Sequence, residues 1–68
     1  MDTTKEFTRL IEFAIREEQK AQELYRDMAA KARDSYARAI LEGLYEQELA
    51  HEEKLRALLS SVKDTTAV

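Results

Sequence analysis

Three side chains in the middle of the sequence have the chemical types that bind first-row metal ions. Glu48 and His51 form a Glu-x-x-His pair, and Glu18 lies 30 residues before Glu48. Residues three apart project from one face of a helix, so a single helix can present a carboxylate and an imidazole together. Carboxylate and imidazole groups accept several first-row ions, including zinc, manganese and iron. Glu18, Glu48 and His51 are therefore the candidate metal-ligating and catalytic residues.

The same three residues interrupt two apolar patterns. A spacing that alternates between three and four residues predicts two seams, each facing a partner helix. The first seam runs through Phe7, Ile11, Ala14, Glu18, Ala21, Tyr25, Met28 and Ala32, and the second through Ala37, Leu41, Leu44, Glu48, His51, Leu55, Leu58 and Val62. A carboxylate in such a seam loses its hydration, at a cost on the order of several kcal/mol unless a partner compensates it. No lysine or arginine occupies either seam, which weakens compensation by a protein cation relative to protonation or a metal ion.

Composition predicts the elements that must position these groups. The 68 residues contain no proline, no cysteine and one glycine, so helix is expected almost throughout. Thr3-x-x-Glu6 reads as a capping box, and Asp34 can cap a second helix. We predict one domain over residues 1–68, with helices over about residues 4–32 and 35–61 and a flexible tail over 62–68. The predicted fold is therefore all-α. Because only two or three residues connect the helices, they must run antiparallel, as a two-helix hairpin.

Distances along the chain place the three groups at one height of that hairpin. Glu18 lies 16 residues before Asp34, and Glu48 and His51 lie 14 and 17 residues after it. One hairpin supplies two carboxylates and one imidazole, whereas two hairpins supply four and two, the ligand set of di-iron four-helix bundles. Apolar residues outside the seams also predict packing beyond one hairpin. They are Leu10, Phe13, Leu24, Ile40, Leu49 and Leu59. We therefore predict that the chain dimerises into a four-helix bundle.

Charge and hydropathy exclude several classes of function. With 14 acidic and 11 basic residues, the net charge of −3 does not favour nucleic-acid binding. The apolar runs are too short to span a membrane. The first residues, Met1 to Thr4, lack the layout of a secretory signal, so we predict a cytoplasmic protein. Without cysteine, neither a disulfide nor a thiolate metal site can form.

Two segments resemble the rubrerythrin and ferritin-like superfamily, and more closely the encapsulated ferritins, in which one chain is half a ferritin. They are Glu18-Gln19-Lys20-Ala21-Gln22-Glu23-Leu24-Tyr25 and Glu48-Leu49-Ala50-His51. The resemblance implies a ferroxidase that oxidises Fe(II) to Fe(III) with O2 at a two-iron site between two subunits. It implies that Glu18, Glu48 and His51 are the iron ligands, that Tyr25 neighbours the site, and that Glu17 lies on the route by which metal reaches it.

The resemblance also implies partners: a ring of such dimers, decameric in form, inside an encapsulin nanocompartment whose shell stores the mineral. The sequence departs from that pattern in three places. Lys20 stands where a further acidic residue is expected, Leu24 replaces an aromatic residue, and residues 60–68 carry no clear shell-targeting signature. The absence of cysteine excludes a rubredoxin module within this chain.

Two other functions fit the same residues. One is a metal-free helical hairpin that serves only in oligomerisation, for which stability and oligomer size are independent of Fe(II). The other is a two-metal bundle that uses another metal, or another oxidant such as peroxide. Simpler roles also exist for two of the residues: Tyr25 as a core residue and Glu17 as a solvated one.

Overall fold

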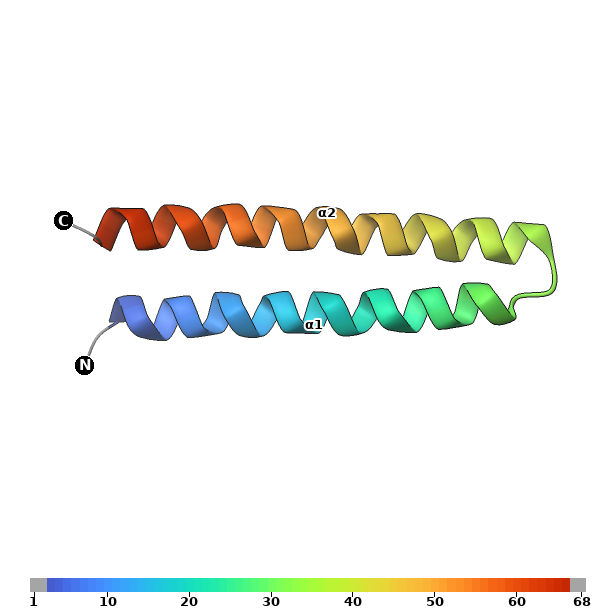
Figure 1. Ribbon diagram of the computed structural model, residues 1–68, viewed down its shortest axis with the longest axis horizontal. Helices are drawn as coiled ribbons and strands as arrows, with labels where there is room; N and C mark the ends of the chain where they lie inside the picture. The colour runs from blue at the N-terminus through green and yellow to red at the C-terminus, as the bar shows by residue number, and fades with distance from the viewer. Residues whose placement is uncertain (1–2, 67–68) are drawn as a thin grey trace.

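The computed structural model describes residues 3–66, which form two long helices (Figure 1). Helix α1 spans Thr3–Lys31 and helix α2 spans Ser35–Thr66. The helices lie side by side and run antiparallel, in a rod with extents of 53 × 18 × 11 Å. The start of α1 and the end of α2 lie at one end of the rod, and the connection lies at the other. The prediction of an all-α, antiparallel two-helix hairpin is confirmed.

One side chain of the three-residue connection and one of α2 stabilise the reversal between the helices. The Asp34 carboxylate accepts a hydrogen bond from the backbone N–H of Ala37 at 2.8 Å, which satisfies one free amide of the first turn of α2. The Arg38 guanidinium donates to the carbonyl oxygen of Ala32 at 3.1 Å, just past the end of α1. The chain therefore reverses within three residues.

Helix α2 continues beyond its predicted end at residue 61 and reaches Thr66. Residues 62–66, predicted to belong to a flexible tail, are helical, so that part of the prediction is wrong. Val62 is half-buried and keeps the seam spacing, and no proline or glycine follows it to end the helix. The last two residues of the predicted tail, 67 and 68, lie outside the described residues.

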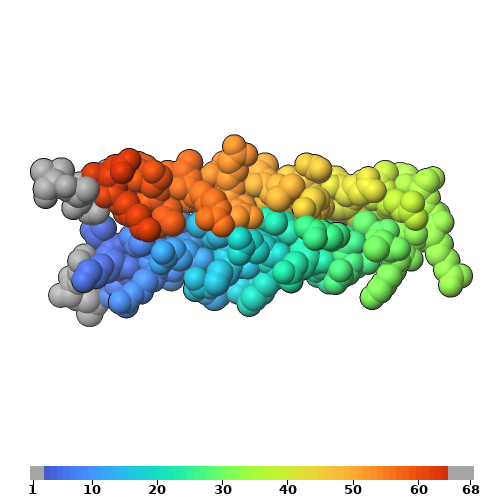
Figure 2. Space-filling view, viewed as in Figure 1, coloured from blue at the N-terminus to red at the C-terminus, as the bar shows by residue number. Residues whose placement is uncertain are grey.

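The interface between the helices is narrow. Figure 2 shows the two helices packed against each other along the length of the rod. Ile11, Ile15 and Gln22 are the buried residues among those described. Neither helix of the described part is long and apolar enough to cross a membrane. A hairpin with so few buried side chains is a small unit that gains from further association.

The seam of α1 is rotated by about one residue from the predicted one. The buried residues Ile11, Ile15 and Gln22 follow the shifted spacing, as do the half-buried Thr4, Thr8, Glu18, Tyr25 and Ala29, whereas the predicted members Ala14 and Ala21 are half-buried as well. Phe7 is 47% exposed and Met28 is 45% exposed, so neither lies between the helices as predicted. The reason is that 3.6 residues per turn do not divide seven evenly, so two adjacent spacings can satisfy the same apolar pattern.

The seam of α2 differs from the prediction in its C-terminal half. The half-buried residues of α2 are Ala37, Leu41, Leu44, Tyr45, Glu48, Glu52, Leu55, Leu59 and Val62. His51 and Leu58 were predicted in the seam but are exposed, whereas Glu52 and Leu59 take their places. The rotation moves His51 from the middle of the interface to its edge.

The hairpin consequently has two different edges. The edge that we call the site flank carries Glu18 and His51, and helical periodicity places five exposed apolar side chains along it. They are Phe7, Leu10, Met28, Ile40 and Leu58. The opposite edge, the polar flank, carries Gln19, Arg26, Tyr45, Glu52 and Arg56, which bond across the interface or along it.

Candidate metal centre

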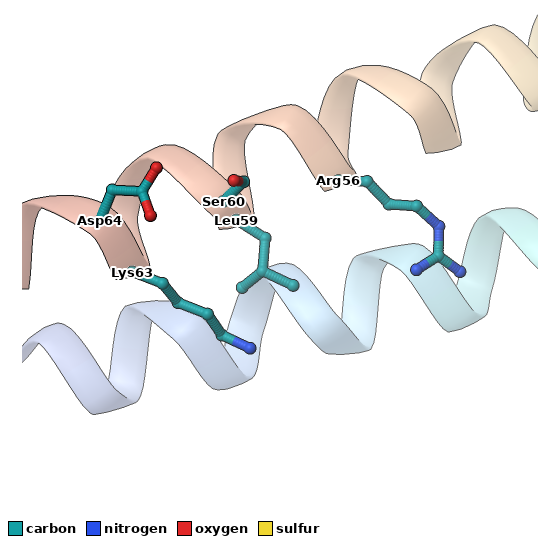
Figure 3. A pocket seen from close by; sticks show the side chains of 5 residues that line it. All are labelled: Arg56, Leu59, Ser60, Lys63 and Asp64. Atoms are coloured by element: carbon teal, nitrogen blue, oxygen red, sulfur yellow. The ribbon is translucent and has the colours of Figure 1, made fainter. Parts of the chain in front are cut away.

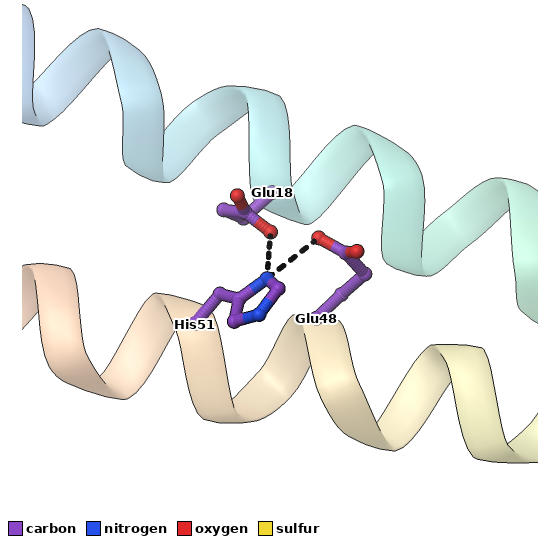
Figure 4. A group of neighbouring side chains, drawn as sticks. All are labelled: Glu18, Glu48 and His51. Carbon is purple, nitrogen blue, oxygen red and sulfur yellow. Dashed lines mark ion pairs between the residues drawn. The ribbon is translucent and has the colours of Figure 1, made fainter.

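The side chains of Glu18, Glu48 and His51 converge midway along the hairpin (Figure 4). The Nδ1 atom of His51 lies 3.5 Å from Oε2 of Glu18 and 3.6 Å from Oε2 of Glu48. One ligand atom from each residue lies within 4.8 Å of the other two. Among the described residues this is the one group of at least three such side chains that could share an ion. The structure thus brings together all three residues that the sequence singled out.

The two carboxylates of this group are poorly hydrated. The side chain of Glu18 is 23% exposed and that of Glu48 is 18% exposed, whereas His51 is 52% exposed on the open side. The Oε2 atom of Glu18 is buried and accepts no hydrogen bond. No described lysine or arginine forms an ion pair with either carboxylate. An unsatisfied buried oxygen costs about 1–3 kcal/mol, and a divalent cation would remove that cost.

The donor types match those of iron and related ions. Two carboxylates bring negative charge and hard oxygen atoms, and His51 brings an imidazole nitrogen. Three donors leave further coordination positions, which can be filled from a second chain or by small molecules. Because His51 lies at the edge, these positions open towards the site flank. The residues present therefore fit a metal ion.

A set of polar side chains lies at the same level on the opposite edge. The Gln22 amide donates hydrogen bonds to Oε1 of Glu52 at 2.8 Å and to the carbonyl oxygen of Glu48 at 3.4 Å. The Gln19 amide donates to Oε2 of Glu52 at 3.1 Å, and Nε of Arg56 donates to the same oxygen at 2.9 Å. We call Gln19, Gln22, Glu52 and Arg56 the hub. Unlike Glu18, every carboxylate oxygen of Glu52 has a partner.

The hub lowers the pKa of the Glu52 carboxyl below its ordinary value. The hydrogen bond from Gln22 contributes most, followed by that from Arg56. The sequence analysis did not find these residues, because Gln22 follows the predicted seam position Ala21 and Glu52 follows His51. One feature of the sequence could have indicated them. Two hub residues directly follow candidate ligands: Gln19 follows Glu18, and Glu52 follows His51.

Tyr25 is half-buried in the α1 seam, two turns from Glu18. It lines a hollow of about 320 Å³ with Arg26, Ala29, Glu42, Tyr45 and Glu46. Arg26 donates a hydrogen bond to the Tyr45 hydroxyl at 3.1 Å, and its guanidinium carbon lies 5.5 Å from the centre of that ring. The Tyr25 hydroxyl bonds to no other described residue. Its place beside the metal remains a prediction.

Glu17 lies outside the group. Its carboxylate is exposed and forms an ion pair with Lys20 one turn away, at 3.4 Å. Lys20 occupies the position at which the resemblance expects a further acidic residue. An exposed pair of this kind contributes little to stability. The role of Glu17 in guiding metal inward therefore also remains a prediction.

Another hollow lies towards the end of α2 (Figure 3). Arg56, Leu59, Ser60, Lys63 and Asp64 line it. Its lining contains two cations, one carboxylate and no imidazole, and so lacks the donor set of a transition-metal site. Metal chemistry therefore falls to the group of Figure 4.

Comparison with known protein families agrees with the candidate metal centre described above. A family model described as Rubrerythrin matches residues 1–67. The chain belongs to the rubrerythrin family. That family includes di-iron oxidoreductases, and its members typically bind iron. No curated protein and no solved structure gave a significant match.

Membership in the rubrerythrin family explains the two-helix architecture as half of a four-helix fold. The ferritin-like fold of this superfamily is a four-helix bundle with its ligands on inward faces. This chain forms a single pair of helices and carries two carboxylates and one imidazole at mid-length. It is thus a half-ferritin of the rubrerythrin superfamily, and its candidate metal group has the composition of half a di-iron site.

Proposed function

We propose that two copies of this hairpin associate through their site flanks and act as a ferroxidase, which oxidises Fe(II) to Fe(III) with O2 at a two-iron centre between the subunits. The observation that carries the proposal is the group of Glu18, Glu48 and His51, in which a buried Glu18 oxygen has no hydrogen-bond partner. Membership in the rubrerythrin family supports iron as the metal.

The incompleteness of the group supports a second hairpin as the source of the remaining ligands. Two copies together supply four glutamates and two histidines, twice the set found in one chain. Phe7, Met28 and Leu58 are large, apolar and more than two-fifths exposed along the same flank. A second copy related by a two-fold axis would cover these side chains and the open side of His51 together.

Each residue has a distinct part in the proposed reaction. Fe(II) is the substrate, and two ions held together supply two electrons, so that O2 is reduced to peroxide without a free one-electron intermediate. Glu18 and Glu48 neutralise the positive charge and favour Fe(III), the harder ion, because their oxygens are hard, anionic donors. His51 binds through a neutral nitrogen. The apolar flank limits the access of water and strengthens these charge interactions.

Oxygen consumption on addition of Fe(II) to the metal-free protein tests the activity. We expect Glu18→Ala to lower the rate of Fe(II)-dependent O2 uptake by more than about 100-fold, because losing even an outer-shell partner of a metal ligand costs about 10–100-fold. Glu23→Ala removes an exposed carboxylate of the same helix and is the matched control, with an unchanged rate expected. Wild-type oxidation by Glu18→Ala would refute the assignment.

Native mass with and without Fe(II) tests the shared centre. If both chains hold the metal, Fe(II) shifts the assembly equilibrium towards the dimer or its multiples, because the ion binds the assembled state. The dimer mass should then carry two iron atoms for each pair of chains. Iron bound to single chains, with no change in assembly, would contradict a centre between subunits.

The site of iron storage is the last part of the proposal. A rod with extents of 53 × 18 × 11 Å encloses no volume for a mineral, so the oxidised iron must be deposited elsewhere. We propose a ring of dimers that delivers Fe(III) inside an encapsulin shell, with the protein located in that compartment. Co-expression with an encapsulin shell protein, followed by purification of intact shells, tests this step. A chain that stays outside the shells while retaining ferroxidase activity would remove the shell from the proposal and leave the centre intact.

A further inference from the structure

Residues of the hub and of the metal group are direct neighbours at two places in the chain. Gln19 directly follows Glu18, and Glu52 directly follows His51. Adjacent residues of a helix project about 100° apart. A helix that turns one member of such a pair towards the other helix therefore turns its neighbour towards an edge. Where Glu52 lies decides where His51 lies.

The apolar pattern of α2 permits two rotations of the helix. In one, His51 and Leu58 face α1; in the other, their neighbours Glu52 and Leu59 do so. The two leucines are equivalent in hydrophobicity, so they do not distinguish the rotations. In the structure the side chain of Glu52 is 15% exposed and that of His51 is 52% exposed. The carboxylate of Glu52 is thus turned inward, while the imidazole of His51 lies at the edge.

Hydrogen bonds from the hub compensate the inward carboxylate. Both oxygens of Glu52 accept bonds, and the donors come from Gln19, Gln22 and Arg56. Gln22 is 8% exposed and has a second bond, to the carbonyl oxygen of Glu48. Without Gln22, the carboxylate of Glu52 would face α1 with much of its hydration lost, and rotation of α2 would return it to water.

We propose that the hub is a positioning device, in which Gln22 and Glu52 fix the rotation of α2 against α1 and thereby hold His51 at the edge beside Glu18 and Glu48. Neither residue belongs to the candidate metal group of Glu18, Glu48 and His51. The effect on metal binding rests on the proposed function, whereas the control of helix rotation does not. Buried polar groups that select one of several apolar packings are known from coiled coils.

The variant Gln22→Glu tests the device with almost no change of side-chain volume. It removes the donor and sets two carboxylates against each other. We expect the anaerobic affinity for Fe(II), measured by competition with a chromophoric chelator, to fall about 10- to 100-fold. The added negative charge alone would strengthen cation binding, so charge cannot explain a fall.

Two further variants separate positioning from general stability. Gln22→Glu combined with Glu52→Gln exchanges amide and carboxylate, restores a donor–acceptor pair between the helices and keeps the wild-type net charge. We expect its Fe(II) affinity to return close to the wild-type value. Ile15→Val removes one buried methyl group from the same interface and removes no hydrogen-bond donor or acceptor of the hub. The proposal is overturned if the exchange variant fails to restore the Fe(II) affinity. It is also overturned if Ile15→Val and Gln22→Glu, compared at the same loss of melting temperature, weaken Fe(II) binding equally.

A measurement on metal-free protein keeps this test separate from the ferroxidase. His51 is the only histidine of the chain, so its ring protons give one assignable set of NMR signals. We expect nuclear Overhauser effects between the His51 ring and the Glu18 side chain in the wild type and in the exchange variant, and their loss in Gln22→Glu. If the wild type binds no Fe(II), the proposed function fails and this readout still decides the hub. Unchanged contacts in Gln22→Glu would overturn the positioning role.

Discussion

The two flanks of the hairpin treat a carboxylate in opposite ways. On the polar flank, Glu52 is held by donors on both oxygens and has a lowered pKa. On the site flank, Glu18 has a similar burial but one oxygen with no hydrogen-bond partner. The same chemical group thus supports the fold at one edge and costs stability at the other. Unsatisfied groups of this kind mark positions where a ligand or partner is expected.

The largest effect that follows from this difference concerns self-association. Leu58→Glu places a charge among the exposed apolar residues of the site flank. We expect the dimer dissociation constant, measured by analytical ultracentrifugation, to rise about 100-fold, which corresponds to about 2.8 kcal/mol. Leu49→Glu is the matched control, because Leu49 is also exposed on α2 but projects towards the other edge. Dissociation of the dimer by Leu49→Glu, with no effect of Leu58→Glu, would put the dimer interface on the polar flank and contradict the proposal.

A second prediction sets the two carboxylates directly against each other. In metal-free protein we expect Glu18→Leu to raise the free energy of unfolding by about 1 kcal/mol, because it removes an unsatisfied oxygen that is partly screened by solvent. Glu52→Leu should lower the free energy of unfolding, because it leaves the hub donors without their acceptor. Thermal unfolding monitored by circular dichroism measures both. Equal signs for the two variants would show that the flanks do not differ in this way.

The smallest effect concerns pH. The folded state favours ionised Glu52, since its pKa is lowered from an ordinary value of 4.5. The stability that Glu52 contributes is therefore present above pH 4.5 and is lost as the pH falls through the lowered pKa of the folded state. We expect Glu52→Gln to be less stable than the wild type near neutral pH, and the difference to shrink in acid. A difference in melting temperature that grows in acid would contradict this sign.

Helix content, hairpin topology and the level of the candidate site could be predicted from the sequence. The absence of proline, the single glycine and the Asp34 cap favour the two helices, and a three-residue connection leaves only an antiparallel arrangement. Residue counts from that turn bring Glu18, Glu48 and His51 to one height. These features depend on local propensity and chain length, which a single sequence contains.

Helix rotation could not be predicted in the same way. Phe7 and Thr8, or Leu58 and Leu59, satisfy the same three-four spacing, so the apolar pattern leaves two adjacent choices. The choice depends on hydrogen bonds between residues about 30 positions apart, such as Gln22 with Glu52. Propensity and periodicity contain no information on such a pair. The end of α2 could not be predicted for a related reason. Its last turns are only weakly apolar, and what favours helix there is the packing of Val62 against α1, which the sequence of α2 alone does not show.

The tight reversal after α1 gives the rod a direction. The start of α1 and the end of α2 lie together at one tip (Figure 1). The candidate metal group lies near the middle of both helices, well away from that tip. A fluorescent protein or surface anchor joined at either terminus would therefore sit beyond the tip and leave the working edge uncovered. Such a fusion could immobilise the hairpin in one orientation and still allow a second hairpin to dock.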